Sequence, residues 1–143
     1  MIKTKLKEKN IQTLFGKQNN IPGVYELKLC KGTSIRWDAV KDHQIKALTM
    51  AKSESGLYYK IPDSPVSQTA EVTRFTARKP FDCFFVSGFP AYVVVCWYVP
   101  RKRKTLYYID ICDYIDANVH SERKSYREDE ARAMARFVVE LKG

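Results

Sequence analysis

Residues 91–99, which read AYVVVCWYV, are the stretch that most constrains what this chain can fold into. They carry no charged side chain, and β-branched and aromatic residues stand at both odd and even positions. Such a pattern is typical of a strand that is covered on both faces. The residues before it, 81–86 (FDCFFV) and the turn 87–90 (SGFP), complete a predicted hairpin. We therefore expect residues 81–99 to form the centre of a β-sheet.

A strand, a helix and a second strand are predicted ahead of this hairpin. Residues 24–29 follow a turn at 19–23 and read as a strand. Apolar side chains recur at helical spacing over residues 38–52, Gly56 ends that helix, and residues 57–61 read as the next strand. Because the links between them are short, we expect a right-handed crossover between two parallel strands.

Helical patterns are also predicted towards both ends of the chain. Residues 2–15 carry a weak helical pattern among lysines. Residues 106–111 read as a further strand. Ser125 with Glu128 three residues later is a capping-box signature, and it predicts a helix that continues to residue 142. The expected fold is α/β (α+β), a central mixed β-sheet flanked by helices. We expect one domain over residues 1–143, with a flexible basic arm at 1–10.

Length, composition and charge restrict the classes of function. The chain has 143 residues, which suits one domain with a core, and no apolar run approaches the length of a membrane-spanning helix. The basic N-terminus leads to no apolar signal segment, so we expect a cytoplasmic protein without a membrane partner. The four cysteines are widely spaced, which argues against a zinc site. The formal charge of +9 favours a polyanionic partner, most often nucleic acid.

The strand at 24–29 carries the side chains that are best suited to bind a metal ion or a phosphate. Side chains alternate along a strand, so Glu26 and Lys28 project from the same face. Such a pair is either an ion pair on a solvated sheet face or a site in which the carboxylate holds a divalent cation and the amine stabilises charge on a phosphate. The helix that follows is expected to place Gln44 or His43 beside this face.

The order of these motifs resembles the PD-(D/E)xK nuclease superfamily, and most of all its Holliday-junction-resolvase-like branch. The segments that carry the resemblance are YELK at 25–28, DHQIKAL at 42–48 and GLYYKI at 56–61. The resemblance implies a restriction-endonuclease-like fold and metal-assisted phosphodiester hydrolysis. It implies that Asp82, Glu26 and the backbone carbonyl of Leu27 bind Mg²⁺ or Mn²⁺. Lys28 would stabilise the transition state, and Gln44 would orient a water molecule or a phosphate oxygen.

One departure from the family pattern leaves two alternatives open. The family's aspartate usually precedes the Glu-x-Lys strand by about a dozen residues, and here residues 12–16 contain no acid. Pro80-Phe81-Asp82 instead comes long after Glu26. Either Asp82 reaches Glu26 from a separate segment, or the site is degenerate.

The basic residues near the predicted hairpin are expected to contact phosphates without reading sequence, because no segment reads as a recognition helix. These residues are Arg74, Arg78, Lys79, Arg101, Lys102, Arg103 and Lys104. The leading hypothesis is a metal-dependent, structure-selective DNA endonuclease, a Holliday junction resolvase that acts on branched DNA as a homodimer, since symmetric cleavage needs two active sites. The alternatives are a catalytically inactive nucleic-acid-binding protein that retains the nuclease fold and a basic interaction protein without a nucleic-acid partner.

Overall fold

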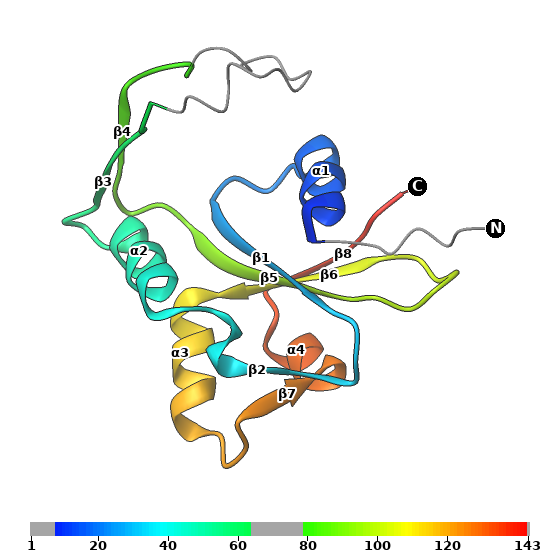
Figure 1. The fold of residues 1–143 in the computed structure, drawn as a ribbon. Coiled ribbons are helices and arrows are strands. Elements are labelled where there is room, and N and C mark those ends of the chain that lie inside the picture. The colour runs from blue at the N-terminus through cyan, green and yellow to red at the C-terminus, as the bar shows by residue number, and fades with distance from the viewer. Residues whose placement is uncertain (1–7, 64–78, 143) are drawn as a thin grey trace.

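The computed structural model describes residues 8–63 and 79–142, so that most of the predicted N-terminal arm and the predicted phosphate contacts Arg74 and Arg78 lie outside the described residues. Strands and helices are mixed along the described chain (Figure 1). In order they are α1 Glu8–Gln18, β1 Val24–Cys30, β2 Ser34–Arg36, the 3-10 turn Trp37–Ala39, α2 Asp42–Lys52, β3 Leu57–Lys60, β4 Cys83–Val86, β5 Ala91–Trp97, β6 Thr105–Asp110, α3 Ile111–His120, β7 Ser125–Arg127, α4 Glu128–Met134 and β8 Phe137–Glu140. None of the helices in this part of the chain has the length and apolarity needed to cross a membrane.

A four-stranded sheet in the order β1-β5-β6-β8 forms the centre of the fold. β1 and β5 are parallel, whereas β5 with β6 and β6 with β8 are antiparallel, so the predicted mixed sheet is confirmed. All seven residues of β5 are buried, as the apolar pattern at 91–99 predicts for a central strand.

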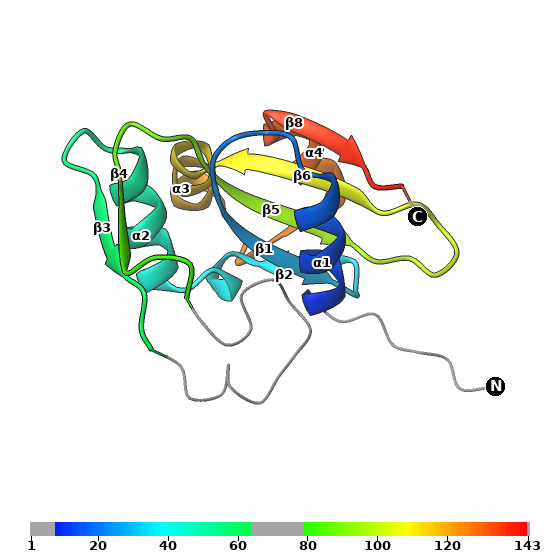
Figure 2. The ribbon, with the colours of Figure 1, turned by 90° about the horizontal axis from the view of Figure 1, so that it is seen from above.

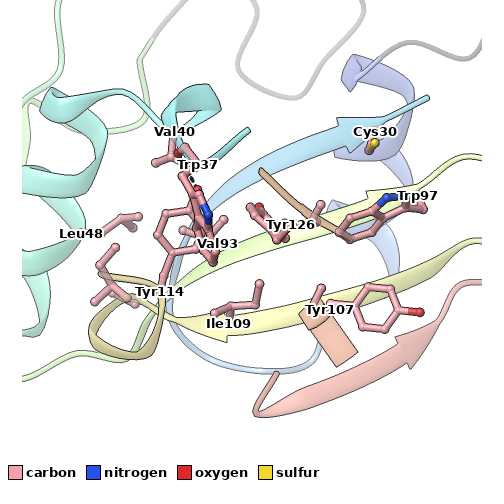
Figure 3. Close-up of a cluster of buried hydrophobic side chains, with 14 residues drawn as sticks. Cys30, Trp37, Val40, Leu48, Val93, Trp97, Tyr107, Ile109, Tyr114 and Tyr126 are labelled. Atoms are coloured by element: carbon pink, nitrogen blue, oxygen red, sulfur yellow. Dashed lines mark hydrogen bonds between the residues drawn. The ribbon is translucent and has the colours of Figure 1, made fainter. Parts of the chain in front are cut away.

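Two hydrophobic clusters cover the two faces of this sheet. Alternate residues of β5 and β6 point to opposite sides, which explains why β5 needs apolar side chains throughout. On one face α1 supplies Ile11 and Phe15. On the other face Leu48 of α2 and Tyr114 of α3 pack with Trp37, and Figure 3 shows this cluster around Val93 and Ile109.

Trp37 connects several of the elements on that second face. Its indole donates a hydrogen bond to the carbonyl of Arg123 (3.2 Å), and its own carbonyl accepts one from the hydroxyl of Tyr114 (2.7 Å). Its ring lies 4.3 Å from that of Tyr126 in β7, the strand that pairs with β2. The start of α2, which begins five residues after Trp37, is therefore anchored next to the core.

The predicted pairing of two strands is wrong. β3 does not join the main sheet as a parallel neighbour of β1, and residues 81–99 do not form a hairpin. β3 and β4 pair with each other in a separate antiparallel sheet, while β5 pairs with β1. The turn between β4 and β5 bonds to the end of α2 instead of closing a hairpin, because the amides of Gly88 and Phe89 donate to the carbonyls of Ser53 (2.9 Å) and Ala51 (3.1 Å). The crossover from β1 through α2 thus ends at β5.

The prediction of a C-terminal helix over residues 125–142 is also wrong. These residues form β7, the short helix α4 and the edge strand β8. Ser125 pairs with Arg36 in the β2–β7 sheet, and the cap is made by Glu130, whose carboxylate accepts from the amide of Arg127 (3.3 Å). The run Phe137-Val138-Val139 joins β6 as a strand. β-Branched and aromatic residues favour this outcome.

Gly56, directly before β3, occupies a position where a side chain would be strained and crowded. Its φ is +79°, and a Cβ built there would lie 2.5 Å from Cζ of Phe85 and 2.7 Å from the carbonyl oxygen of Val86. We expect Gly56→Ala to lower the free energy of unfolding by about 1–2 kcal/mol, through backbone strain and displacement of the Phe85 ring. Urea denaturation followed by circular dichroism measures this loss. Gly32→Ala is the matched control, because no atom lies within 4 Å of its added Cβ, and an equal loss in both variants would contradict the explanation.

Candidate functional site

Glu26 and Lys28 form an ion pair on one face of β1. Nζ of Lys28 lies 3.2 Å from Oε1 of Glu26, as the alternation of the strand predicts. The side chains are only 23% and 15% exposed, so this pair does not stand on a freely solvated face. In the register of β1 with β5, Glu26 and Lys28 lie beside Val93 and Val95, two buried residues of the α2-covered face. The low exposure strengthens the field that the two charges exert nearby.

Gln44 brings α2 into contact with this pair. Its Nε2 donates a hydrogen bond to Oε1 of Glu26 (2.9 Å), and its Oε1 accepts one from the backbone amide of Lys41 (2.9 Å). The same carboxamide therefore caps the start of α2 and orients the carboxylate on β1. Of the two helix residues considered from the sequence, Gln44 makes the contact, whereas His43 is exposed.

The arrangement offers one oriented carboxylate with an ammonium group beside it. Gln44 and Lys28, the partners of Glu26 among the described residues, both contact Oε1, so Oε2 is the oxygen that a cation or a water molecule can approach. Leu27, whose backbone carbonyl is the third predicted ligand, lies between them on β1, and its side chain packs on the opposite face of the sheet. The site can attract a cation through Glu26 and a phosphate oxygen through Lys28.

The fit of this site to Mg²⁺ depends on how many protein ligands the ion needs. Among residues 8–63 and 79–142, no group of three or more His, Cys, Asp or Glu side chains is placed to hold a metal ion. An enclosed protein cage is therefore not formed by these residues. Mg²⁺ in phosphate chemistry usually takes one or two carboxylates and completes its shell with water and substrate phosphates. The donor chemistry of Glu26 suits that mode of binding.

Asp82 belongs to a different ion-pair cluster. It directly precedes β4, its side chain is 86% exposed, and its carboxylate lies 3.3 Å from Nζ of Lys79. Lys79 also pairs with Asp63 at 2.9 Å, and its hydrogen bond lowers the pKa of that carboxyl. The structure thus brings together Glu26, Lys28 and Gln44, whereas the contacts of Asp82 lie within the segments that flank β3 and β4.

Four of the predicted phosphate contacts, residues 101–104, lie in the connection between β5 and β6. We call these four residues the basic tip. Arg101, Lys102 and Arg103 are exposed, and Lys104 is half-buried. The guanidinium of Arg103 lies 3.4 Å from the carboxylate of Glu140 in β8, a pair that is exposed at both ends. Such pairs exchange readily for other partners. The tip can therefore present its charges to a polyanion.

A buried ion pair between α2 and α3 is not predicted from the sequence. Asp110 is 5% exposed, and both of its oxygens accept hydrogen bonds from Nζ of Lys52 at 2.8 and 2.7 Å. It also caps α3, a helix that the sequence reasoning did not foresee, by accepting from the amide of Cys112 (2.9 Å). Asp113, in the first turn of α3, pairs with Arg136 at 2.9 Å. Both acids are thus held in ion pairs between elements of the fold.

We compared the chain with models of protein families, with curated proteins and with solved structures, and none of them matches it. The function therefore has to be argued from the residues of the site and from the charge of the chain.

Proposed function

We propose that this protein is a metal-dependent, structure-selective DNA endonuclease with a restriction-endonuclease-like fold, a Holliday junction resolvase that acts on branched DNA as a homodimer. One observation carries the proposal. Glu26 and Gln44, which are 18 positions apart, meet at 2.9 Å with Lys28 beside them, and these are three of the four side chains that the resemblance to the nuclease superfamily singles out. An ordinary surface ion pair on one strand does not require a hydrogen bond from a side-chain amide on a separate helix.

Each residue has a defined role in the proposed reaction. Glu26, the carbonyl of Leu27 and Asp82 would hold Mg²⁺ or Mn²⁺, which supplies positive charge at the scissile phosphate and lowers the pKa of a water molecule. Lys28 offsets the negative charge that develops on the attacked phosphate. Gln44 holds the carboxylate of Glu26 in one orientation. For Asp82 to serve as a ligand, its carboxylate has to leave Lys79, an exposed ion pair whose loss costs little, and it has to move to Glu26.

A cleavage assay tests the proposal directly. The protein is incubated with a labelled four-way junction and with a linear duplex of the same sequence, in Mn²⁺, in Mg²⁺ and in EDTA. We expect cuts near the branch point of the junction in the presence of either metal, little cleavage of the duplex, and no cleavage in EDTA. A protein that leaves all substrates intact under these conditions contradicts the enzymatic proposal.

A second candidate function is nucleic-acid binding without catalysis. The observation that favours it is that both acids proposed as metal ligands are paired with lysines, Glu26 with Lys28 at 3.2 Å and Asp82 with Lys79 at 3.3 Å. If these pairs persist when DNA is bound, the lysine ammonium groups offset the charge of the two carboxylates and weaken their attraction for a cation. A gel shift without cleavage in the same assay would support this candidate.

Binding of DNA should depend steeply on salt under both candidate functions. With about six phosphate contacts, the affinity is expected to fall about a thousandfold between 50 and 200 mM salt, because each contact releases counterions. Lys102→Gln/Arg103→Gln should reduce the slope of log K against log salt by about two. Fluorescence anisotropy over a salt series measures the slope, with Lys17→Gln/Lys124→Gln as a control of equal charge on exposed residues elsewhere. Equal slopes for the two double variants would contradict a role of the tip.

A further inference from the structure

Exposed aromatic side chains gather on the small sheet of β3 and β4. Tyr58 is 62% exposed and Phe85 is 60% exposed, and the two stand directly opposite each other in the register of the strands. Tyr59, Phe81 and Phe89, in or next to this sheet, are exposed as well. In Figure 1 and Figure 2 the β3–β4 sheet lies outside the four-stranded sheet, beside α2. Large apolar side chains left in solvent as a group usually mark a surface that binds something.

The two faces of this sheet differ. Alternation places Tyr58 and Lys60 on the same face as their partners Phe85 and Cys83, and all four of these side chains are exposed. We call this the outer face. The opposite face holds Leu57, Phe84 and Val86, which are partly buried, together with Tyr59, whose ring stacks on Phe84 at 5.5 Å between centroids. The outer face therefore keeps its rings available to a ligand.

The ring of Phe85 on the outer face packs against the residue directly before β3. The ring of Phe85 lies against the backbone of Gly56, where a Cβ would come within 2.5 Å of its Cζ. Cys83, on the opposite strand two residues before Phe85, faces outward with Tyr58 and raises the pKa of the Tyr58 hydroxyl. Rings that are already ordered lose less conformational freedom when a ligand stacks on them.

The charge of the chain indicates which ligand this face takes. The protein carries a formal charge of +9, which draws polyanions to it, and Lys60 stands on the outer face itself. The neighbouring acids Asp63 and Asp82 share the ammonium group of Lys79, so they do not form a free acidic patch. Flat rings next to a lysine on a basic protein match the stacking platforms that bind single-stranded nucleic acid, because every base has a π-face.

We propose that the outer face of the β3–β4 sheet binds unpaired bases of single-stranded nucleic acid, with Tyr58 and Phe85 each stacking on a base and Lys60 contacting a phosphate. This inference rests on the proposed function only in that the partner is nucleic acid, and it requires neither a metal ion nor cleavage. In a branched substrate, the bases freed near the branch point are the ones that would reach this face.

Binding to short oligonucleotides in EDTA tests the inference apart from catalysis. Fluorescence anisotropy with a labelled oligothymidylate of about twelve nucleotides compares the wild type with Tyr58→Ala and Phe85→Ala. We expect each variant to bind roughly 5- to 100-fold more weakly, the loss of one stacked base. Phe85→Trp should retain the affinity. Phe137→Ala is the matched control, since that ring is 43% exposed but lies on β8, and its affinity should equal that of the wild type.

A second probe separates stacking from charge. An abasic oligonucleotide of the same length keeps the phosphates and lacks the bases, so the wild type should bind it more weakly than either single variant binds oligothymidylate, because both stacked bases are lost. The salt slope of Tyr58→Ala should equal that of the wild type, because stacking releases no counterions.

The inference is overturned if Tyr58→Ala and Phe85→Ala, folded by circular dichroism, bind oligothymidylate as tightly as the wild type. Equal affinity of the wild type for the abasic probe has the same consequence. A dimer that Phe85→Ala converts to a monomer without any change in oligonucleotide affinity would assign the face to a second copy of the chain instead. If the protein cuts no DNA but passes these binding tests, the endonuclease proposal is contradicted and the binding of bases by the outer face is supported.

Discussion

Glu26→Gln should slow metal-dependent cleavage of a four-way junction by about a hundredfold or more, the usual cost of losing one charged group at a phosphoryl site. The substitution keeps the shape of the side chain and an oxygen that accepts from Nε2 of Gln44. It removes the negative charge that a divalent cation requires. Lys28→Met should have an effect of similar size, because it removes the charge that stabilises the attacked phosphate. Single-turnover rates at saturating protein measure both effects.

The control for Glu26→Gln is a loss of the same charge at a place remote from the site. Glu122→Gln serves this purpose, since Glu122 is exposed in the connection between α3 and β7, and its rate should equal that of the wild type. Because Glu26→Gln leaves the ammonium of Lys28 without its partner, thermal unfolding of each variant must be measured as well. A folded Glu26→Gln variant that cleaves at the wild-type rate would show that Glu26 holds no essential metal.

Part of the site, the group of Glu26, Lys28 and Gln44, could be predicted from the sequence because it follows from local structure. The alternation of a strand is enough to place Glu26 and Lys28 on one face. The helix that follows β1 has to pack over the sheet, and this limits the residues that can reach the carboxylate to one or two polar side chains near its start. Gln44 makes that contact. These three residues can therefore be placed together from the geometry of one strand and of the helix that follows it, without knowledge of how the other strands pair.

The position of Asp82 depends on strand pairing, which local pattern does not determine. Residues 81–86 and 91–99 both read as strands and are joined by a short turn, which is typical of a hairpin. The chain instead pairs β4 with β3 and β5 with β1. The partners of the turn, the carbonyls of Ala51 and Ser53, come from a helix far away in sequence. Such pairings are decided by the packing of the whole sheet.

The C-terminal region shows a competition between two periodicities. Ala131, Met134, Ala135, Val138 and Leu141 fit one helix face, but the helix ends at Met134. Phe137, Val138 and Val139 have high β-propensity, and β6 offers an edge to which they pair. Tertiary pairing overrides the helical spacing here, because Phe and Val are weaker helix formers than the alanines before them and the edge of β6 offers partners for their backbone groups.

The burial of Asp110 could not be predicted because it depends on an ion pair between distant elements. The sequence places an acid at the end of a strand, where most acids are exposed. Lys52, at the last position of α2, reaches across to it, with its Nζ 2.7 and 2.8 Å from the two carboxylate oxygens. The same carboxylate begins α3. This pair joins two helices on the face of the sheet that also holds Glu26.

Lys52→Met should lower the free energy of unfolding by about 2–3 kcal/mol at pH 7. Removing the lysine leaves the carboxylate of Asp110 buried, with the amide of Cys112 as its one remaining hydrogen-bond donor among the described residues, and an uncompensated buried charge is costly. The estimate takes the lower part of the usual range, since the side chain of Lys52 is 35% exposed and solvent screens the pair. Urea denaturation measures the loss. Lys46→Met on the same helix, exposed and equal in charge, should change stability by less than about 0.5 kcal/mol.

The pH dependence of this loss identifies its cause. Burial by itself raises the pKa of Asp110, but the hydrogen bonds from Lys52 and from the amide of Cys112 outweigh it, so the pKa lies below its usual range. A lowered pKa in the folded protein stabilises the fold above the unfolded value of about 3.9, and this stabilisation is lost as the pH falls through the folded value. The difference between wild type and Lys52→Met should therefore be full at pH 7 and shrink as the pH falls towards 3. Lys52→Met/Asp110→Asn, which keeps a cap without a charge, should recover part of the loss at pH 7. A difference that stays constant down to pH 3 would mean that lost packing, and not the ion pair, destabilises the variant.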